Sequence, residues 1–313
     1  MATGLSERLT EARPPGLLAR LQRASWKGQR IDWSAYVFIL PFVVSSFVFL
    51  LAPILFGGYV SLTEWGIVGD PKWLGLDNFA RAFADPWVPK IWANTLKYGL
   101  IVVPGVTVVG LLFALYVNQQ KPGHTIMRTA FYAPHVVSVT VIGLVWVWML
   151  DTQYGLVNQY LGGFGVPNIP WLTNPAWVLF GVGIAAIWWE AGFSMVVLLA
   201  GLQDIPRELR EAAAVDGANT WMTFWRIVLP LLRPALSLVI TIEIIATLRV
   251  FSLIYVMTNG GPAGASASVI SYVFETGFAK YQLGYAAALS MMLFVTILIV
   301  TLVELKLVRE AND

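Results

Sequence analysis

Apolar residues are gathered into long stretches, and shorter segments between them hold most of the charged side chains. A helix needs about 20 mostly apolar residues to cross roughly 30 Å of hydrocarbon, and it satisfies its own backbone hydrogen bonds there. Barrel strands would alternate at every second residue, which these stretches do not. The pattern predicts an all-α integral membrane protein with six transmembrane helices at residues 36–62, 94–117, 129–150, 177–202, 232–257 and 285–307.

The composition supports this interpretation and narrows the chemistry. The chain is 58% hydrophobic and 12% charged, with a mean hydropathy of +0.70, whereas soluble domains carry about 25% charged residues. A net charge of +2 provides no strong attraction for nucleic acid. The absence of cysteine excludes disulfides, thiolate metal sites and cysteine nucleophiles.

Motifs of common membrane or nucleotide enzymes are missing from the sequence. There is no G-x-x-x-x-G-K-[ST] phosphate loop, no H-E-x-x-H and no G-x-S-x-G, and the two histidines are His124 and His135. We therefore expect no catalytic residue, no metal site and no cofactor in this chain.

Lysine and arginine predict the orientation of the chain. Most of them lie in the N-terminal segment and after the second, fourth and sixth stretches, so both termini are predicted to be cytoplasmic. Tryptophans cluster at the opposite ends of the stretches, as in an outer aromatic belt. The predicted organisation is a basic cytoplasmic leader at 1–34, a six-helix transmembrane domain at 35–307 with an inner loop at 203–231, and a cytoplasmic tail at 308–313.

Four connecting segments carry local predictions. Residues 17–26 of the leader form either a surface helix against anionic lipid or part of a solvated tail. The outer segment 63–93 has room for a small helix near 78–83. The outer segment 151–176 is rich in Gly, Asn and Pro, and the segment 258–284 opens with the turn-forming run TNGGPAGAS before a helical pattern.

The inner segment 203–231 is far longer than a turn between two helices requires. Asp204 is predicted to cap a first short helix that accepts Pro206 in its first turn. Gly217 provides a change of direction, and Asn219 or Thr220 can cap a second helix that Pro230 ends. Periodicity leaves two interpretations open: a plug for a socket on another protein, or an amphipathic segment on the bilayer surface.

A spaced motif within this segment points to a known family. Residues 211–230 read EAAAVDGANTWMTFWRIVLP, which is Glu-Ala-Ala, three residues, Gly, nine residues, Ile, one residue and Leu-Pro. This resembles the signature of the integral membrane subunits of bacterial ABC importers. The stretches WLGLDNFARAF and FSLIYVMTNGGPAGAS resemble the carbohydrate-uptake branch, and the likeness covers most of the chain from residue 36 onward.

The resemblance implies a type I importer permease of the bacterial plasma membrane, which translocates solute and is not itself an enzyme. Such subunits pair with a second, similar permease, usually a different chain. Two ATP-binding subunits, which hold ATP and Mg, attach to the signature segments, and a solute-binding protein docks outside. The residues that this implies for ATPase coupling are Glu211, Ala212, Ala213, Asp216, Gly217, Ile227, Leu229 and Pro230.

The implied cargo is a di- or oligosaccharide, and the alternative cargo is a glycerol phosphate. The alternative function is that of a secondary carrier that works without ATP. Charged groups inside spans are costly and tend to face protein or water. Glu243 and Arg249 lie about 240° apart on one helix, so a direct pair is not expected. Such groups could instead join helices or contact the partner permease. The candidates for a sugar path are Trp188, Trp189, Glu190, Glu243, Arg249 and Tyr255.

Overall fold

The structure, a computed structural model, describes residues 33–66, 69–119 and 121–312 and is mostly helical. The predicted leader segment with its surface helix at 17–26 lies outside the described residues, and helix α2 begins at Trp33. Met1–Leu55 and Phe56–Asp313 form separate compact units, and each is described by itself. The elements are α2 (Trp33–Ser46), η1 (Phe47–Leu51), α3 (Ala52–Ser61), β1 (Thr63–Glu64), β2 (Lys72–Trp73), α4 (Asp77–Ala84), α5 (Trp87–Asn118), α6 (His124–Val136), α7 (Val139–Met149), α8 (Leu156–Gly162), α9 (Val178–Gln203), α10 (Arg207–Val215), α11 (Thr220–Thr223), η2 (Phe224–Val228), α12 (Leu229–Leu231), α13 (Arg233–Leu248), α14 (Ser252–Thr258), α15 (Val269–Phe274), η3 (Glu275–Ala279) and α16 (Leu283–Asn312).

Four helices among the described residues are long and apolar enough to cross a membrane, at Tyr36–Ser61, Trp87–Asn118, Val178–Gln203 and Leu283–Glu304. Two further helix pairs pass the same test together but are bent, by 99° between α6 and α7 and by 65° between Thr220–Leu231 and α13. The described chain therefore has four to six candidate spans, all at predicted positions. The sixth helix continues to Asn312, beyond the predicted end at residue 307.

The prediction of one continuous third helix at 129–150 is wrong. Helix α6 contains Pro134 and ends at Val136, and α7 starts at Val139 after a sharp bend. Proline removes a backbone donor and cannot continue the ladder, which favours a break near its position. The indole N–H of Trp189 donates to the carbonyl of Val137 at 3.3 Å, so one backbone group freed by the bend is bonded.

The fifth predicted helix, 232–257, is also interrupted. Helix α13 ends at Leu248, and α14 begins at Ser252. The hydroxyl of Ser268 donates to the carbonyl of Val250 at 2.7 Å and bonds a backbone group that the interruption leaves free. Arg249 and Ser252 border this break, but the apolar residues on both sides keep the stretch apolar as a whole, so hydropathy did not reveal it.

Two π-helical turns precede prolines. The turn η1 lies just before Pro53, and η2 lies just before Pro230. A proline ring displaces the carbonyl four residues earlier, and a wider turn accommodates this. Pro230 therefore lies inside the helical segment, contrary to the prediction that it ends the second short helix. That segment ends at Leu231, and Pro234 lies in the first turn of α13.

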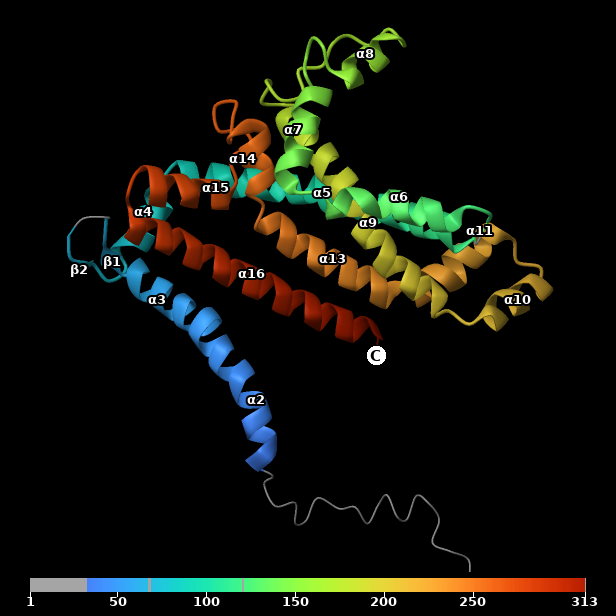
Figure 1. The fold of residues 1–313 in the computed structure, drawn as a ribbon, viewed down its shortest axis with the longest axis horizontal. Coiled ribbons are helices and arrows are strands. Elements are labelled where there is room, and N and C mark those ends of the chain that lie inside the picture. The colour runs from blue at the N-terminus through green and yellow to red at the C-terminus, as the bar shows by residue number, and fades with distance from the viewer. Residues whose placement is uncertain (1–32, 67–68, 120, 313) are drawn as a thin grey trace, which may run out of the picture. The chain divides into compact units, whose positions relative to one another are not determined.

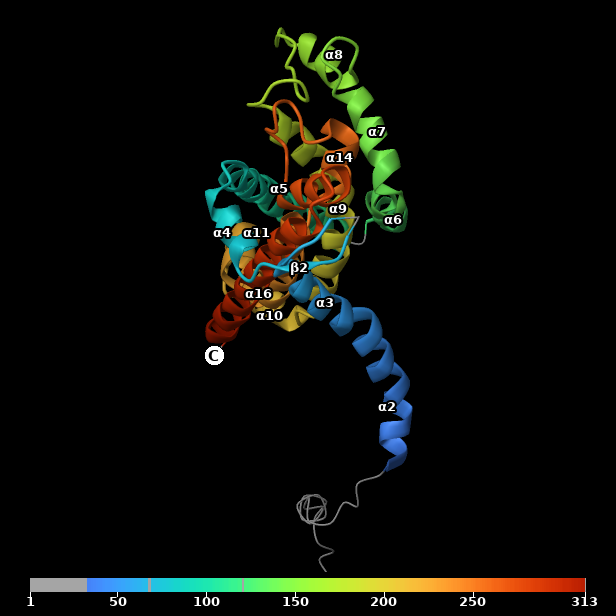
Figure 2. The ribbon, with the colours of Figure 1, turned by 90° about the vertical axis from the view of Figure 1, so that its left-hand side faces the viewer.

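Helix α9 is the central element of the unit that begins at Phe56, because it packs against α5, α6 and α13 (Figure 1). Two glycines allow close approach: a side chain at Gly192 would meet the backbone carbonyl of Phe131 in α6, and one at Gly110 in α5 would lie 2.8 Å from Cβ of Ser194 in α9. Helices α7 and α8 extend away from this group of helices in both views (Figures 1 and 2).

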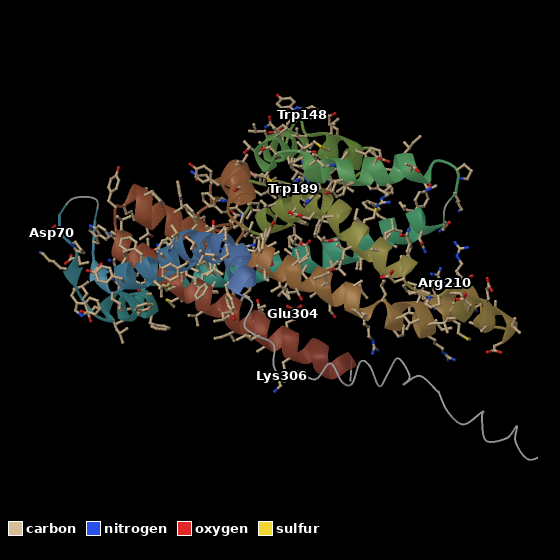
Figure 3. All side chains as sticks on the ribbon, turned by 60° about the horizontal axis from the view of Figure 1, so that its bottom comes forward. Asp70, Trp148, Trp189, Arg210, Glu304 and Lys306 are labelled. Carbon is tan, nitrogen blue, oxygen red and sulfur yellow. The ribbon has the colours of Figure 1, made fainter. Side chains whose placement is uncertain are left out.

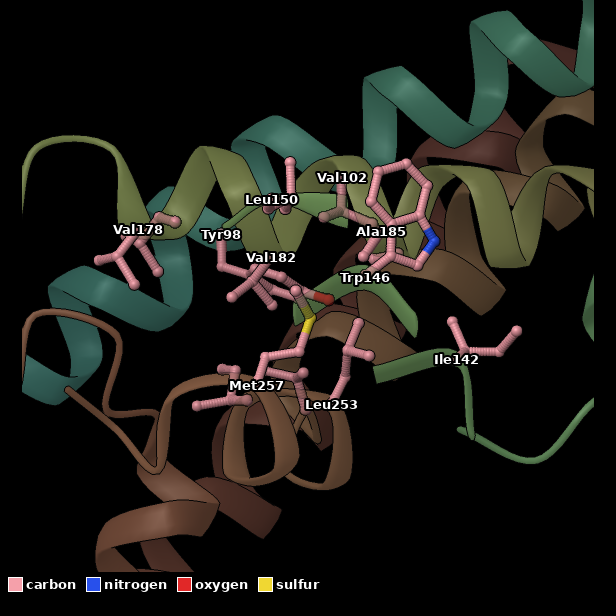
Figure 4. Close-up of a cluster of buried hydrophobic side chains, with 14 of the residues drawn as sticks. Tyr98, Val102, Ile142, Trp146, Leu150, Val178, Val182, Ala185, Leu253 and Met257 are labelled. Carbon is pink, nitrogen blue, oxygen red and sulfur yellow. The ribbon is translucent and has the colours of Figure 1, made fainter. Parts of the chain in front are cut away.

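One hydrophobic cluster joins α5, α7, α9 and α14. Tyr98 and Val102 of α5 contact residues of the other three helices, and Trp146 comes from α7 (Figure 4). Burial of this cluster holds α7 and α14 against α5 and α9, although α7 and α14 each follow a break in the chain's helices. The other labelled members of this cluster are Ile142, Leu150, Val178, Val182, Ala185, Leu253 and Met257.

The end of the unit that holds α4, α15 and the short antiparallel pair of β1 and β2 is called the hairpin end, and the opposite end, at α10, is called the α10 end (Figure 1). At the hairpin end the hydroxyls of Tyr272 and Tyr285 donate to Asp85 at 2.7 and 2.8 Å. Burial alone would raise the pKa of Asp85, but the hydrogen bonds it accepts and a nearby positive charge hold the pKa below its ordinary value. The predicted small helix at 78–83 is confirmed as α4.

We expect Gly192→Val to lower the free energy of unfolding by about 1–3 kcal/mol, because the added side chain must displace the backbone of α6. The matched control is Ala200→Val, at an exposed position of the same helix. Thermal unfolding of the purified protein in detergent measures both. Equal stability of the two variants would contradict the close packing of α6 on α9.

We expect Asp85→Asn to lower stability by about 1–2 kcal/mol at neutral pH, since two hydroxyls lose a charged acceptor. The contribution of Asp85 is complete above the ordinary Asp pKa of about 3.9 and is lost as pH falls through the lower folded-state value. Thermal melts across a pH series test this, with Asp70→Asn as the exposed control. A variant difference that does not shrink as the pH falls below about 3.9 would argue against the carboxylate as its source.

Candidate functional site

A cavity of about 190 Å³ lies between α5, α9, α13 and α14. The structure brings four of the six predicted path residues to its wall: Trp189 and Glu190 from α9, Glu243 from α13 and Arg249 from the break after α13. Figure 3 labels Trp189 in the interior of the unit, between Asp70 at the hairpin end and Arg210 at the α10 end. The remaining wall residues are Tyr98, Val102, Val139, Ala186, Ala246, Thr247, Val250, Phe251, Ser252 and Leu253.

Glu243 is the most deeply buried charged residue of this wall, with 2% of its surface exposed. Its Oε1 accepts a hydrogen bond from the Ser194 hydroxyl at 3.3 Å, while Oε2 has no partner among the described residues. Buried acceptors in folded proteins are nearly always bonded. An unbonded carboxylate oxygen on a cavity wall is therefore a candidate acceptor for a donor group of a ligand or of water.

Glu190 lies beside His135, which the sequence analysis did not assign to the site. Their carboxylate and imidazole atoms Oε2 and Nδ1 are 3.3 Å apart, with about a quarter of each side chain exposed. This Nδ1 has no aligned hydrogen bond among the described residues, so the two groups are close neighbours without a directed bond. The His135 ring lies 5.3 Å from that of Phe193 and 6.0 Å from that of Trp189.

Two predicted path residues lie elsewhere. Trp188 is 46% exposed and packs edge-on against Trp146 at 5.8 Å, away from the cavity wall. Tyr255 is 46% exposed and lines a separate groove at the hairpin end. A role for either residue in a substrate path stays a prediction.

Arg249 and Glu243 share the cavity despite their predicted separation around the helix. The predicted separation of about 240° assumed an unbroken helix through both residues. Helix α13 ends at Leu248, and the break that follows gives Arg249 another direction. No ion pair joins the two among the residues that the structure describes, which agrees with the prediction that they do not pair directly. The cavity wall therefore combines two carboxylates, one guanidinium and aromatic rings.

The segment after α9 forms two short helices joined by a tight turn. Gly217 has φ +81, and the amides of Gly217 and Ala218 donate to the carbonyls of Ala214 and Ala213, which is a Schellman ending of α10. The side chain of Asn219 accepts from the Met222 amide at 2.8 Å and caps α11, as predicted. The predicted cap at Asp204 is wrong: Pro206 is the N-cap residue of α10, with no side-chain cap.

This segment is held to the central helix by a side-chain hydrogen bond and by apolar packing, in which Val228 joins a cluster with Leu198 and Leu202, and its turn is exposed. The guanidinium of Arg210 donates to the carbonyl of Leu202 in α9 at 3.0 Å, and Ala213 is buried. Val215 is 88% and Trp221 70% exposed, so the turn presents apolar groups outward. Of the other residues implied for coupling, Glu211, Ala212 and Asp216 are exposed, and Ile227, Leu229 and Pro230 are partly buried.

The described residues form a helical membrane protein with a capped, exposed segment at one end and interrupted helices beside a mostly apolar cavity that carries three charged side chains. Residues 106–309 match the family of binding-protein-dependent transport system inner membrane components. The chain therefore belongs to this family of ABC importer permeases.

Relatives and solved structures agree with the family. The chain is 34% identical to the trehalose/maltose transport system permease protein MalF of Thermococcus litoralis, over 89% of this chain and 94% of the relative. It is 32% identical to the arabinooligosaccharides transport system permease protein AraP of Bacillus subtilis, over 87% of each. A crystal structure of a bacterial ABC transporter that imports alginate matches 95% of this chain and 99% of that chain, with a TM-score of 0.78 at 25% identity.

The alginate transporter has also been solved with an alginate-bound periplasmic protein. That structure matches 92% of this chain and 95% of the solved chain, with a TM-score of 0.76 and 25% identity. The fold of an importer permease is thus shown for this chain.

Proposed function

We propose that this chain is the translocation subunit of an ATP-driven importer for a di- or oligosaccharide. The observation that carries the proposal is the spaced motif at 211–230, which occupies a capped and exposed helical turn in a chain of the importer permease family. The relatives named for trehalose/maltose and arabinooligosaccharides support a sugar as the cargo.

The proposed assembly contains a second, similar permease, two ATP-binding subunits at the α10 end and a solute-binding protein at the hairpin end. The family description and the alginate transporter with its periplasmic protein support the last of these partners. In this arrangement the chain has six spans and both termini are cytoplasmic. ATP and Mg bind to the partner ATPases, and this chain needs no cofactor of its own.

The segment of α10 and α11 would transmit movement of the ATPases to the cavity. Arg210 bonds the carbonyl end of α9, and the same helix carries Glu190 at the cavity wall. A helix resists bending, so displacement of α10 moves α9 as one piece. The interrupted helices at Val137 and Arg249 provide places where the cavity wall can change without breaking a continuous ladder.

We expect Gly217→Pro to insert normally into the membrane but to abolish substrate-stimulated ATP hydrolysis by the reconstituted transporter. Proline cannot adopt the φ of +81 and removes the amide that bonds Ala214. Gly165→Pro is the matched control, since Gly165 has φ +79 and donates to Gly162 at the end of α8, away from the α10 end. Normal coupling in vesicles containing Gly217→Pro would refute the lever assignment.

The proposed sugar path begins with the cavity residues. An aromatic ring such as Trp189 can cover the apolar face of a sugar, while Glu190, Glu243 and Arg249 offer hydrogen bonds to hydroxyl groups. Arg249 is also compatible with a glycerol phosphate, but the two carboxylates on the same wall oppose an anionic cargo.

We expect Glu190→Gln and Arg249→Gln each to weaken sugar binding by the assembled transporter about tenfold, the loss of roughly one charged hydrogen bond. Trp148→Phe, at an exposed position of α7 outside the cavity and not among the candidate path residues, is the control. Sugar titration of the complex in nanodiscs gives the affinities. Unchanged affinity in both variants would remove these residues from the path, and uptake by this chain without an ATPase would favour a secondary carrier.

A further inference from the structure

A second recess, called the aromatic groove, opens at the hairpin end. It has a volume of about 450 Å³, and its wall includes Trp87 of α5, Tyr255 of α14, and Tyr272 and Phe274 of α15. Trp87, Tyr255 and Phe274 are each between 37% and 46% exposed, so their rings face open space. Large rings in a recess provide flat apolar surfaces for a ligand.

Polar groups stand among these rings. Glu275 and Lys280 form an ion pair at 2.9 Å, and both are about half exposed, so they can also bond a ligand. Asn259 and Ser271 add an amide and a hydroxyl to the same wall. Glu275 and Lys280 bond each other, and the Ser271 hydroxyl bonds the backbone of Ser268, so none of the three requires a ligand as a partner. The half-exposed charges can still bond hydroxyl groups. A sugar ring, with its apolar face and hydroxyl rim, matches both the aromatic rings and these charges, whereas a lipid chain matches the rings alone.

The groove is held in shape before any ligand binds. Lys90 donates to the carbonyl of Ala263 at 2.6 Å, and the Asn94 amide donates to the carbonyls of Gly264 and Ala267 at 2.9 and 3.1 Å. These bonds fasten the turn that follows α14 to helix α5. A preformed wall reduces the ordering cost of binding.

Ring contacts connect the groove to the interior cavity. Phe251 lines the cavity, and its ring centroid is 5.3 Å from that of Tyr255 and 5.1 Å from that of Phe274, both of which line the groove. At about 190 Å³ the cavity is smaller than the roughly 300–1,000 Å³ of pockets that enclose drug-sized ligands, which suits one sugar ring. A second ring must then lie elsewhere.

We propose that Tyr255 and Phe274 form a subsite for a second sugar ring, and that these two rings with Phe251 are a track along which an oligosaccharide passes from the aromatic groove into the cavity. This inference rests on the proposed sugar cargo and deepens it, because it assigns a chain of at least two rings as the substrate. Stacking on the groove contributes only when the substrate is long enough to reach it.

The test measures affinity against chain length. The complete permease–ATPase complex in nanodiscs, without binding protein, is titrated by saturation-transfer NMR with glucose, maltose and maltotriose, and with arabinose, arabinobiose and arabinotriose. We expect the affinity of the wild type to rise along at least one series. Tyr255→Ala and Phe274→Ala should lower trisaccharide affinity about two- to tenfold and leave the monosaccharide unchanged. Tyr255→Phe should restore the affinity, and Tyr160→Ala, an exposed ring outside both recesses, should match the wild type.

Two results would overturn the proposal. Wild-type affinity that does not rise with chain length in either series would exclude a second subsite. A loss in the alanine variants that is equal for monosaccharide and trisaccharide would indicate a structural role for the rings. The proposed function is tested separately by ATP-dependent uptake of the same sugars by vesicles containing the transporter and its binding protein. Uptake to which Tyr255 and Phe274 contribute nothing rejects only the track. No uptake of any sugar rejects both the track and the proposed function.

Discussion

The close approach of α6 and α5 to α9 is the constraint on which the rest of the structure depends. Inside lipid there is little hydrophobic gain from joining two helices, so association relies on small residues that let backbones come near. Gly192 and Gly110 provide this contact, and the resulting cluster holds α7 and α14 in place. The cavity lies between these helices, and charged side chains from α9, α13 and the break after α13 reach its mostly apolar wall.

Polar groups gather where helices are interrupted. Trp189 bonds the carbonyl freed at the bend between α6 and α7, and Ser268 bonds the carbonyl freed after α13. Next to these places lie His135 with Glu190, and Arg249. Breaks in a membrane helix require polar partners, and in this unit the breaks lie beside the cavity whose wall carries Glu190, Glu243 and Arg249. The irregular backbone and the charged side chains inside the membrane domain thus lie in the same region of the unit.

The sequence predicted the class and order of the helices, since their apolar length is a strong signal. It also predicted the turn at Gly217 and the cap at Asn219, which depend on local residue chemistry. The breaks after Val136 and Leu248 were not predicted, because hydropathy does not register a change of direction. For this reason Arg249 seemed to face away from Glu243. His135 could have been found as a polar residue next to Pro134 in an apolar stretch, whereas nothing in the sequence places Ser194 opposite Glu243.

Helix α9 carries the bond from Arg210 at one end and Glu190 at the cavity wall, with no interruption between them. One residue inserted into α9 between Glu190 and Leu202 would rotate Glu190 relative to the Leu202 carbonyl by about 100° and would move the two about 1.5 Å farther apart along the helix. Either the carboxylate would leave the cavity or the fastening of α10 would be lost. The spacing of residues along this stretch of α9 is therefore fixed by the geometry of its two ends.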